Sequence, residues 1–182
     1  MFVISLMDLN LYGPWYEMAH DYIWRNFEEP ELLCDLISSF SPNSRTRFCV
    51  QRALRMHRMA MEGHGLLDWE RDMGIMTSHR KNIQRSLKGE PLSGHKVSRF
   101  AQNLRGNYVP VTIDVWMCRA YKMSPKLNLS QYRQLERDVQ VKAINWSVEP
   151  ATYQAAVWMW ERRRHGHNDL WLHKLIEEVM NE

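Results

Sequence analysis

The stretch EPLSGHKVSRFAQNLRGNYVPVTIDVWMCRAYKM, residues 90–123, combines two turns with two helix starts and decides how the chain is organised. After the first turn a helix opens at Gly94, which lacks a side chain and so lets another backbone come close. The unpaired N–H groups at this helix start can hold a phosphate. Asp114 stands at the next helix start, where a carboxylate caps free N–H groups. We therefore expect an amine, Lys96, and a carboxylate, Asp114, at two neighbouring helix starts.

Helical patterns continue on both sides of this stretch, with apolar residues recurring every three to four positions. Helices are predicted over 15–27, 31–40, 44–61, 79–87, 96–104, 114–123, 131–144, 151–164 and 169–180. Thr77–Ser78 and Ser130 are the predicted caps of the helices that follow them. The run VPVTI alone has strand character, and one such run makes no sheet. The sequence predicts an all-α fold.

Length and composition are those of a globular protein. The chain has 182 residues, of which 45% are hydrophobic and 25% charged, enough for one compact domain or two small lobes. No apolar run approaches the roughly 18 residues that cross a bilayer. The apolar start, residues 1–13, lacks a basic leader, so we expect a packed N-terminal segment. A cytoplasmic protein without a membrane partner is predicted.

Charge is distributed unevenly along the chain, although the net charge is only +3. Residues 1–40 carry one basic and seven acidic residues, a net of −6, whereas residues 41–182 carry 23 basic and 14 acidic residues, a net of +9. A basic body suits a polyanionic partner such as nucleic acid.

Three cysteines, Cys34, Cys49 and Cys118, are too far apart in the sequence for a metal-ligand motif or a disulfide framework. We expect buried, reduced thiols. The histidines make no HExxH-like set either. The sequence therefore predicts neither a metal nor an organic cofactor.

The order of motifs resembles the helix-hairpin-helix DNA glycosylases typified by endonuclease III. In that family a hairpin ending Gly-x-Lys precedes an apolar helix, a Val-Asp-Thr-His motif and an Arg-containing helix. This chain has Gly94-His95-Lys96, then VSRFAQNL, then Ile113-Asp114-Val115-Trp116 with Arg119, and its Lys and Asp are 18 positions apart. Segments 33–42 and 79–87 fall where the family has its Leu-rich and Lys-x-x-Asn-Ile helices. The resemblance covers about residues 30–123, and a fainter one extends to short glycosylase-like proteins of phages.

The resemblance implies a single compact unit of two helical lobes with a helix-hairpin-helix element. One lobe would span residues 41–112 and the other residues 1–40 together with 113–182. A nucleotide flipped out of double-stranded DNA would enter between the lobes. Contacts to DNA are predicted for Ser41, Asn43, Arg45, Ser93, Gly94, His95, Arg99 and Arg119. Monomers are the habit of the family, and a phage-encoded member would work in the host cytoplasm.

The implied activity is that of a DNA glycosylase with AP (abasic site) lyase activity. Lys96 would attack the anomeric carbon of the sugar and expel a damaged or modified base, leaving a Schiff base. A helix start favours the neutral amine that this attack needs over the ammonium. Asp114 would stabilise the positive charge that develops on the sugar.

Departures from the family pattern leave other functions open. The hairpin 90–94 reads Glu-Pro-Leu-Ser-Gly and has one glycine fewer than usual, and Trp116 stands where relatives carry His. Two alternatives follow, a non-catalytic DNA-binding protein of the same fold and a phage enzyme that modifies a DNA base. The cluster Arg162–His165 is explained by pairing with a helix dipole or by phosphate binding. His79 and Asn82 belong to the site or to a helix surface.

Overall fold

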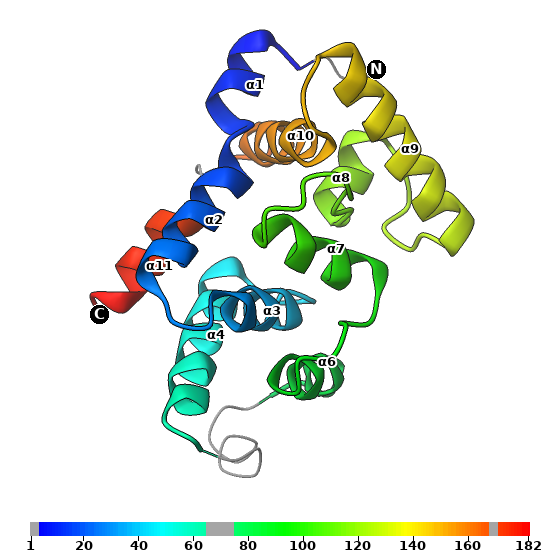
Figure 1. Cartoon of the computed structure of the whole chain (residues 1–182). Coiled ribbons are helices and arrows are strands. Elements are labelled where there is room, and N and C mark those ends of the chain that lie inside the picture. Colours follow the sequence, from blue (N-terminus) through cyan, green and yellow to red (C-terminus); the bar gives the residue numbers. More distant parts are fainter. Residues whose placement is uncertain (1–3, 65–74, 168–170) are drawn as a thin grey trace. The chain divides into compact units, whose positions relative to one another are not determined.

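The computed structural model describes residues 4–64, 75–167 and 171–182, and these residues contain helices and no strand. The helices, shown in Figure 1, are α1 (Leu6–Tyr12), α2 (Trp15–Asn26), α3 (Pro30–Phe40), α4 (Thr46–Met61), α6 (Thr77–Leu87), α7 (His95–Leu104), α8 (Val115–Ala120), α9 (Leu129–Asn145), α10 (Pro150–Arg164) and α11 (Leu172–Met180). The predicted all-α class is confirmed.

The chain divides into two compact units. Unit 1 consists of Met1–His20 and Gln102–Leu172, and unit 2 consists of Asp21–Ala101 and His173–Glu182. The division passes through α2 and α7, so each of these helices contributes to both units. Unit 2 differs from the lobe predicted over residues 41–112, because α3 groups with α4 and α6 rather than with the N-terminal residues.

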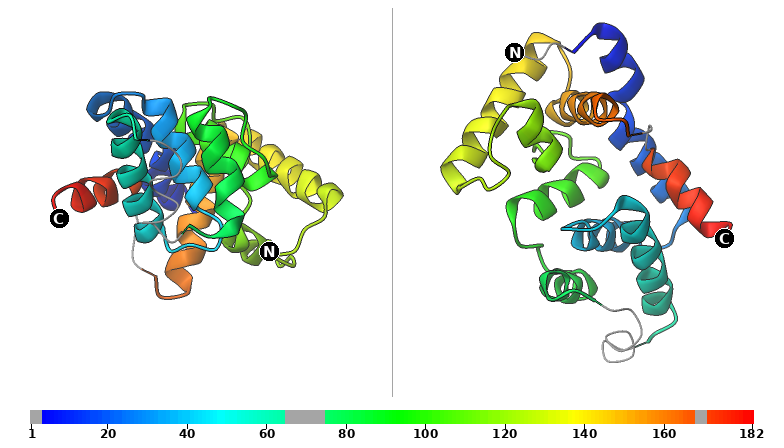
Figure 2. Two further views of the ribbon diagram at one scale, coloured as in Figure 1. Left: turned by 90° about the horizontal axis from the view of Figure 1, so that it is seen from below. Right: turned by 180° about the vertical axis from the view of Figure 1, so that it is seen from behind.

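Helix α3 is the central element of unit 2. It packs against both α4 and α6, and the views in Figure 2 keep these three helices beside one another. Leu33, Leu36, Ile37 and Phe40 are almost completely buried. Each contributes about 1.5–3 kcal/mol through removal of apolar surface from water. The run Leu33–Phe40 is buried at every position, so its polar residues Ser38 and Ser39 also lie in the core.

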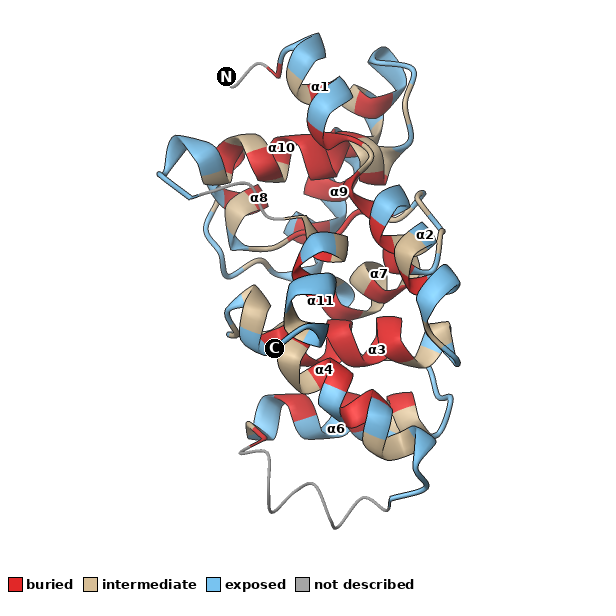
Figure 3. Ribbon diagram, turned by 90° about the vertical axis from the view of Figure 1, so that its left-hand side faces the viewer, coloured by how far each residue is buried: buried red, intermediate tan, exposed pale blue. Residues whose placement is uncertain are grey.

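Helix α10 has the same central place in unit 1, where it packs against α1, α8 and α9. Figure 3 shows much of its length as buried. Small residues at Ala151, Ala155 and Ala156 permit close approach of neighbouring helices on several sides. Because residues around the whole circumference are buried, α10 lacks the polar face of an ordinary surface helix.

The extended run before α8 is held by side chains instead of by a sheet. Asn103 of α7 donates to the carbonyl of Pro110 at 2.8 Å. The Tyr132 hydroxyl of α9 donates to the carbonyl of Val111 at 3.0 Å, and Glu136 accepts from the Val111 N–H at 3.3 Å. Buried main-chain groups of a lone extended segment need such partners. These contacts fix where α8 begins.

Two predicted helix caps are wrong. Ser130 lies inside α9, whose N-cap is Asn128, and the side chains of Asn128 and Gln131 form a reciprocal capping box. Thr77 is the first residue of α6, whose N-cap, Met76, makes no side-chain cap hydrogen bond. At α9 two capping residues, Asn128 and Ser130, lie two positions apart, and at α6 the residue with extended backbone is the apolar Met76, which capping preferences do not select.

Four further predictions concern the cysteines, the N-terminal segment, membrane-spanning helices and the start of the last helix. Cys34, Cys49 and Cys118 are all buried, as predicted. The predicted N-terminal packed segment contains α1, of which Leu9 and Tyr12 are buried. Among the described residues, no helix has the length and apolarity to cross a membrane. The predicted start of the last helix, at Asp169, lies outside the described residues.

Candidate functional site

The predicted site residues fall into both units, so each group is described within its own unit. Asp114 and Arg119 belong to unit 1. The others belong to unit 2: Ser41, Asn43, Arg45, Ser93, Gly94, His95, Lys96 and Arg99.

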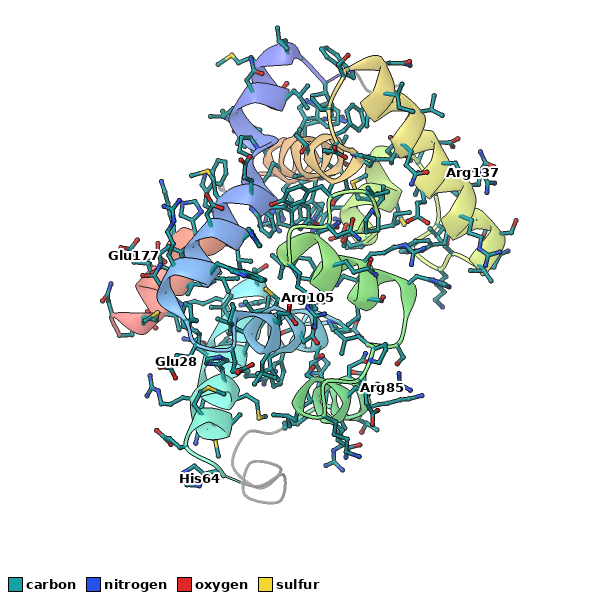
Figure 4. All side chains as sticks on the ribbon, in the orientation of Figure 1. Glu28, His64, Arg85, Arg105, Arg137 and Glu177 are labelled. Atoms are coloured by element: carbon teal, nitrogen blue, oxygen red, sulfur yellow. The ribbon has the colours of Figure 1, made fainter. Side chains whose placement is uncertain are left out.

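The loop between α6 and α7 is fixed by one buried amide. Asn82 of α6 donates through Nδ2 to the Ser93 carbonyl at 2.9 Å. Its Oδ1 accepts from the Ser93 N–H at 2.8 Å and from the Ser93 hydroxyl at 3.1 Å. Arg85, one turn further along α6, donates to the Pro91 carbonyl (Figure 4). Asn82, for which a site role and a surface role were both open, thus positions the loop from inside.

Gly94 directly precedes α7 and has φ +90°, a conformation that side chains disfavour. A Cβ added there would meet nothing within 4 Å. Its carbonyl accepts the first intrahelical bond, from the Ser98 N–H at 2.9 Å. The glycine therefore serves the turn geometry and leaves open space at the start of α7, where a phosphate could reach the backbone.

Lys96, in the first turn of α7, contacts the segment between α3 and α4. Its Nζ donates to the Ser41 carbonyl at 3.2 Å. The next carbonyl, that of Pro42, accepts from Nε2 of the buried His79 at 2.7 Å. The following residue, Asn43, is exposed and has φ +53°. Two side chains from α6 and α7 thus hold successive carbonyls and fix the backbone just before Asn43.

His79 lies among cations and is fully shielded from solvent. Burial lowers its pKa, and Arg52 of α4 and Lys96 of α7 lower it further, against the opposing effect of the bond to Pro42. Because Nε2 donates to a carbonyl, Nδ1 carries the lone pair of the neutral ring, and it has no hydrogen-bond partner. The helix-surface role that the sequence left open for His79 does not occur.

A cysteine nucleophile near Lys96 is disfavoured. Burial raises the pKa of the Cys49 thiol to about 12, although Lys96 and Arg52 act to lower it. The thiol donates to the Ile37 carbonyl at 2.9 Å. A protonated, buried thiol is a poor nucleophile. Cys49 is therefore a poor candidate for a nucleophile.

The remaining predicted residues of unit 2 lie on its surface. His95 and Arg99 are one turn apart on α7, with Nη1 of Arg99 3.4 Å from Nδ1 of His95. Arg45 is exposed at the N-cap of α4. The Ser41 hydroxyl is turned inward and donates to the Ser38 carbonyl at 2.8 Å. Its main-chain N–H donates to the same carbonyl at 3.2 Å, so both donors of Ser41 are already bonded within the chain.

The described residues of 41–101 are strongly basic. Residues 41–64 and 75–101 contain eleven lysines and arginines against two acidic residues, Glu62 and Glu90, a net charge of +9. The positive charge of residues 41–182 is therefore concentrated on α4, α6 and the start of α7, whereas the other described residues of unit 2, 21–40 and 173–182, have a net charge of −6. Two of these acidic residues, Glu178 and Glu182, pair with Arg47 of α4. Such a surface attracts polyanions.

Asp114 is the N-cap of α8 in unit 1, as predicted. Its Oδ1 accepts from the N–H groups of Trp116 and Met117 at 2.9 and 3.0 Å. Its Oδ2 accepts from Nε1 of Trp158 on α10 at 2.8 Å. Both carboxylate oxygens are thus held in place, and the half-buried side chain has a fixed orientation.

Trp116, which stands where relatives of the resembled family carry His, is surrounded by basic side chains. The guanidinium carbon of Arg119 lies 4.4 Å from its ring centroid, and that of Arg162 lies 5.6 Å away. The rings of His165 and His167 lie 5.8 and 4.9 Å from it. Arg119, predicted from α8, and Arg162, from the cluster on α10, therefore meet at one indole.

The other cations at the end of α10 also lie on aromatic rings. Arg163 stacks on Tyr12 of α1 and donates to its hydroxyl. Arg164 lies over Trp160 at 4.7 Å. The buried Glu161 lies 3.0 Å from Nε2 of His165 and 3.5 Å from Nη1 of Arg164. Charge in this cluster is therefore only partly neutralised.

Residue spacing in the sequence indicates part of this cluster, which the motifs considered above do not include. Trp116–Arg119 are three residues apart, and Trp158–Arg162 and Trp160–Arg164 are four apart. Side chains at these spacings meet on a helix surface. No local pattern signals the contact of Arg162 with Trp116, which joins two helices 46 positions apart in the chain.

No group of three or more His, Cys, Asp or Glu side chains in the described part of the chain is arranged to hold a metal ion. In comparisons with known proteins, residues 11–165 match a family described as "Family of unknown function (DUF7178)". No curated protein and no solved structure matches the chain.

Proposed function

The chain belongs to the DUF7178 family, whose function is unknown, and we propose from its own residues that it is a DNA glycosylase with AP lyase activity. In this proposal α6, the loop 88–94 and α7 act as a helix-hairpin-helix element in a two-lobed glycosylase-like fold. The protein acts as a monomer on double-stranded DNA in the cytoplasm. The observation that carries the proposal is the placement of Lys96 beside a rigid, open helix start.

DNA binding is supported by rigidity and charge in unit 2. The hydrogen bonds of Asn82 to Ser93 hold the loop, so the backbone N–H groups that follow Gly94 are positioned before any phosphate arrives. Preorganised N–H groups bind an anion without a further loss of conformational entropy. The net charge of +9 on residues 41–64 and 75–101 adds attraction for the phosphate backbone.

The nucleophile in this proposal is the amine of Lys96. An amine that donates one N–H to the Ser41 carbonyl directs its lone pair away from that carbonyl. In the neutral form it attacks C1′ of the sugar, the C1′–N bond breaks, and the base leaves with the bonding electrons and takes up a proton. Ring opening then gives a Schiff base, and loss of a proton from C2′ expels the 3′ phosphate.

The resemblance assigns charge stabilisation to Asp114. Its carboxylate is held by two N–H groups of α8 and by the indole of Trp158, so it cannot rotate away. A fixed carboxylate stabilises a developing positive charge with little reorganisation. Asp114→Asn keeps the cap and removes the charge. It should lose base removal from intact nucleotides while still forming an adduct with a preformed abasic site.

Borohydride trapping tests the nucleophile. The protein is incubated with a duplex that contains one abasic site, sodium borohydride is added, and covalent adducts are counted on a denaturing gel. We expect an adduct with the wild type and none with Lys96→Arg, which keeps the charge and a donor to Ser41 but cannot form a Schiff base. Lys81→Ala, an exposed position on α6, is the matched control and should trap like the wild type.

Two results would contradict the lyase proposal: no adduct with the wild type, or an adduct of equal yield with Lys96→Arg. A panel of duplexes with different damaged and modified bases then identifies the substrate. Thermal melting of each variant checks that the loss of adduct does not come from unfolding.

A second candidate function is a non-catalytic DNA-binding protein. It is favoured by the bond from Lys96 to the Ser41 carbonyl, because a side chain that holds a loop has a sufficient structural role. Such a protein shifts duplex DNA in a native gel, leaves every strand whole and traps no adduct.

A further inference from the structure

The meeting of Arg119 and Arg162 at Trp116 brings two positive charges close together in unit 1. Their guanidinium carbons lie 4.4 and 5.6 Å from the same ring centroid. The sum of these distances, 10.0 Å, is the largest separation that the two carbons can have. Two like charges this close repel each other, unless an anion lies near both.

The described part of the chain supplies little compensating charge. Arg162 interacts with Asp114 electrostatically, but both carboxylate oxygens accept hydrogen bonds from other groups. Nε of Arg162 is buried and has no hydrogen-bond partner. Burial lowers the pKa of Arg162, and Asp114 opposes this only in part. Its guanidinium is thus desolvated without a full set of acceptors.

Pairing with helix dipoles accounts for where these arginines stand in the sequence, since each is in the last turn of its helix. It does not account for their convergence from two helices on one indole. A guanidinium that stacks on a ring keeps its N–H edge available, and this edge matches two oxygens of a phosphate.

We infer that Arg119 and Arg162, held on Trp116, form a phosphate-binding site in unit 1. Stacking of Arg162 on Trp158 as well, at 4.7 Å, fixes its plane from a second side. The rings of His165 and His167 flank Trp116. Nε2 of His165 already bonds to Glu161, so of these two rings we assign only that of His167 as a donor to the phosphate. This site shares no residue with the hairpin and Lys96 of unit 2.

The shared chemistry of the occupant is a phosphate group, and a nucleic-acid strand and a free phosphate are its two sources. A strand carries a phosphate about every 3.4 Å along the helix axis, so two guanidinium groups within 10.0 Å can bind neighbouring phosphates. The choice of DNA as occupant rests on the proposed function. The existence of the site does not.

Salt-dependent DNA binding tests the inference. Fluorescence anisotropy with a labelled 20-base-pair duplex gives the dissociation constant of the full chain at several salt concentrations. Arg119→Gln and Arg162→Gln together should weaken binding roughly tenfold and should reduce the slope of log K against log salt by about 0.9 for each lost contact. Arg137→Gln, exposed on α9 (Figure 4) and bonded to Gln134, is the control and should change neither quantity.

A conservative variant and a free anion complete the test. Arg162→Lys keeps the charge and loses the bidentate edge, so an intermediate affinity is expected. Stabilisation of the wild type by inorganic phosphate in a thermal-melting assay, absent from the double variant, also supports the site and identifies free phosphate as a source. If the double variant matches the wild type in both assays, the inference is wrong.

The failure of this inference is distinguishable from the failure of the proposed function. Absence of an adduct with the wild type, with DNA affinity still dependent on Arg119 and Arg162, contradicts the glycosylase alone. A normal adduct with no dependence on either arginine contradicts the phosphate site alone.

Discussion

Unit 2 and unit 1 use their basic and polar side chains in opposite ways. Around the α6–α7 loop, polar side chains bind the main chain: Lys96 holds Ser41, His79 holds Pro42, and Asn82 holds Ser93. At the end of α10 the basic side chains lie on aromatic rings instead.

The difference distinguishes two roles for a side chain. A donor that satisfies a backbone carbonyl removes a desolvation cost, so its loss should appear mainly as a loss of stability. A guanidinium stacked on a ring gains only about 0.5–1 kcal/mol at exposed sites, and its N–H edge stays available for an anion. Substitutions in unit 2 should therefore lower stability more than those in the arginine cluster.

The largest effect is expected at Asn82. Asn82→Ala removes three hydrogen bonds and takes away the Asn82 partner of the half-buried N–H and carbonyl of Ser93. The free energy of unfolding should fall by about 2–4 kcal/mol, as for other losses of a buried hydrogen-bond network. Urea unfolding measures it.

Gln84→Ala is the matched control, because Gln84 is an exposed amide on the same helix. It should change stability by less than about 0.5 kcal/mol. Equal effects of the two substitutions would mean that the loop does not depend on Asn82, and the contrast between the units would lose its strongest case.

Asp114 should give a smaller effect that depends on which atoms remain. Asp114→Ala removes the cap of α8 and the acceptor of the Trp158 indole, at a cost of about 1.5–3 kcal/mol. Asp114→Asn keeps an oxygen at the cap but turns an amide NH2, which cannot accept, toward the Trp158 indole, so it should cost about 1–2 kcal/mol, less than Asp114→Ala. Urea unfolding of both variants decides whether the carboxylate is needed for folding.

Asp138→Ala controls for the loss of any carboxylate from unit 1, since Asp138 is exposed on α9 and accepts only from the neighbouring Gln134. If Asp114→Asn lowers the free energy of unfolding as much as Asp114→Ala does, the carboxylate charge and its bond to Trp158, rather than the cap oxygen, stabilise α8.

Much of the fold is predictable from the sequence because local rules dominate it. Apolar spacing and the Gly and Pro signals predict the described helices of both units except α1, and Asp114 caps α8 as its position predicts. The capping error at Ser130 arises because Asn128 also fits the cap, and the error at Thr77 arises because the apolar Met76 takes the N-cap position. The grouping of α3 with α4 and α6 depends on packing between segments that no local pattern relates.

The candidate site is predictable only where its partners are local. Sequence motifs predict Lys96 and Arg119 as site residues. Nothing in the sequence indicates, however, that Lys96 bonds to the Ser41 carbonyl, 55 positions away. Likewise, the sequence does not predict that Asn82 bonds to Ser93, because its position in a helical pattern does not distinguish a buried Asn from an exposed one. By contrast, the contacts of Arg119 with Trp116, of Arg162 with Trp158 and of Arg164 with Trp160 join residues three or four positions apart, so residue spacing in the sequence predicts them.

The smallest expected effect is a pH dependence centred on His79. Its pKa in the folded protein lies below the ordinary value of 6.5, because the ring is buried and faces Arg52 of α4 and Lys96 of α7. The unfolded chain therefore binds a proton at a higher pH than the folded one. Stability is fully present above the unfolded pKa and falls as pH drops through the window between the two values. His173 has a lowered pKa as well and contributes with the same sign.

His79→Gln isolates this contribution, because the amide can still donate to the Pro42 carbonyl and does not titrate. Urea unfolding from about pH 7.5 to about pH 5.5 should show a smaller loss of stability for this variant than for the wild type. Gln84→Ala, exposed on the same helix, removes no titratable group and should leave the wild-type profile unchanged. If His79→Gln follows the wild-type profile throughout, protonation of His79 does not cause the loss of stability at low pH. The main-chain role of these side chains would then rest on Lys96 and Asn82 alone.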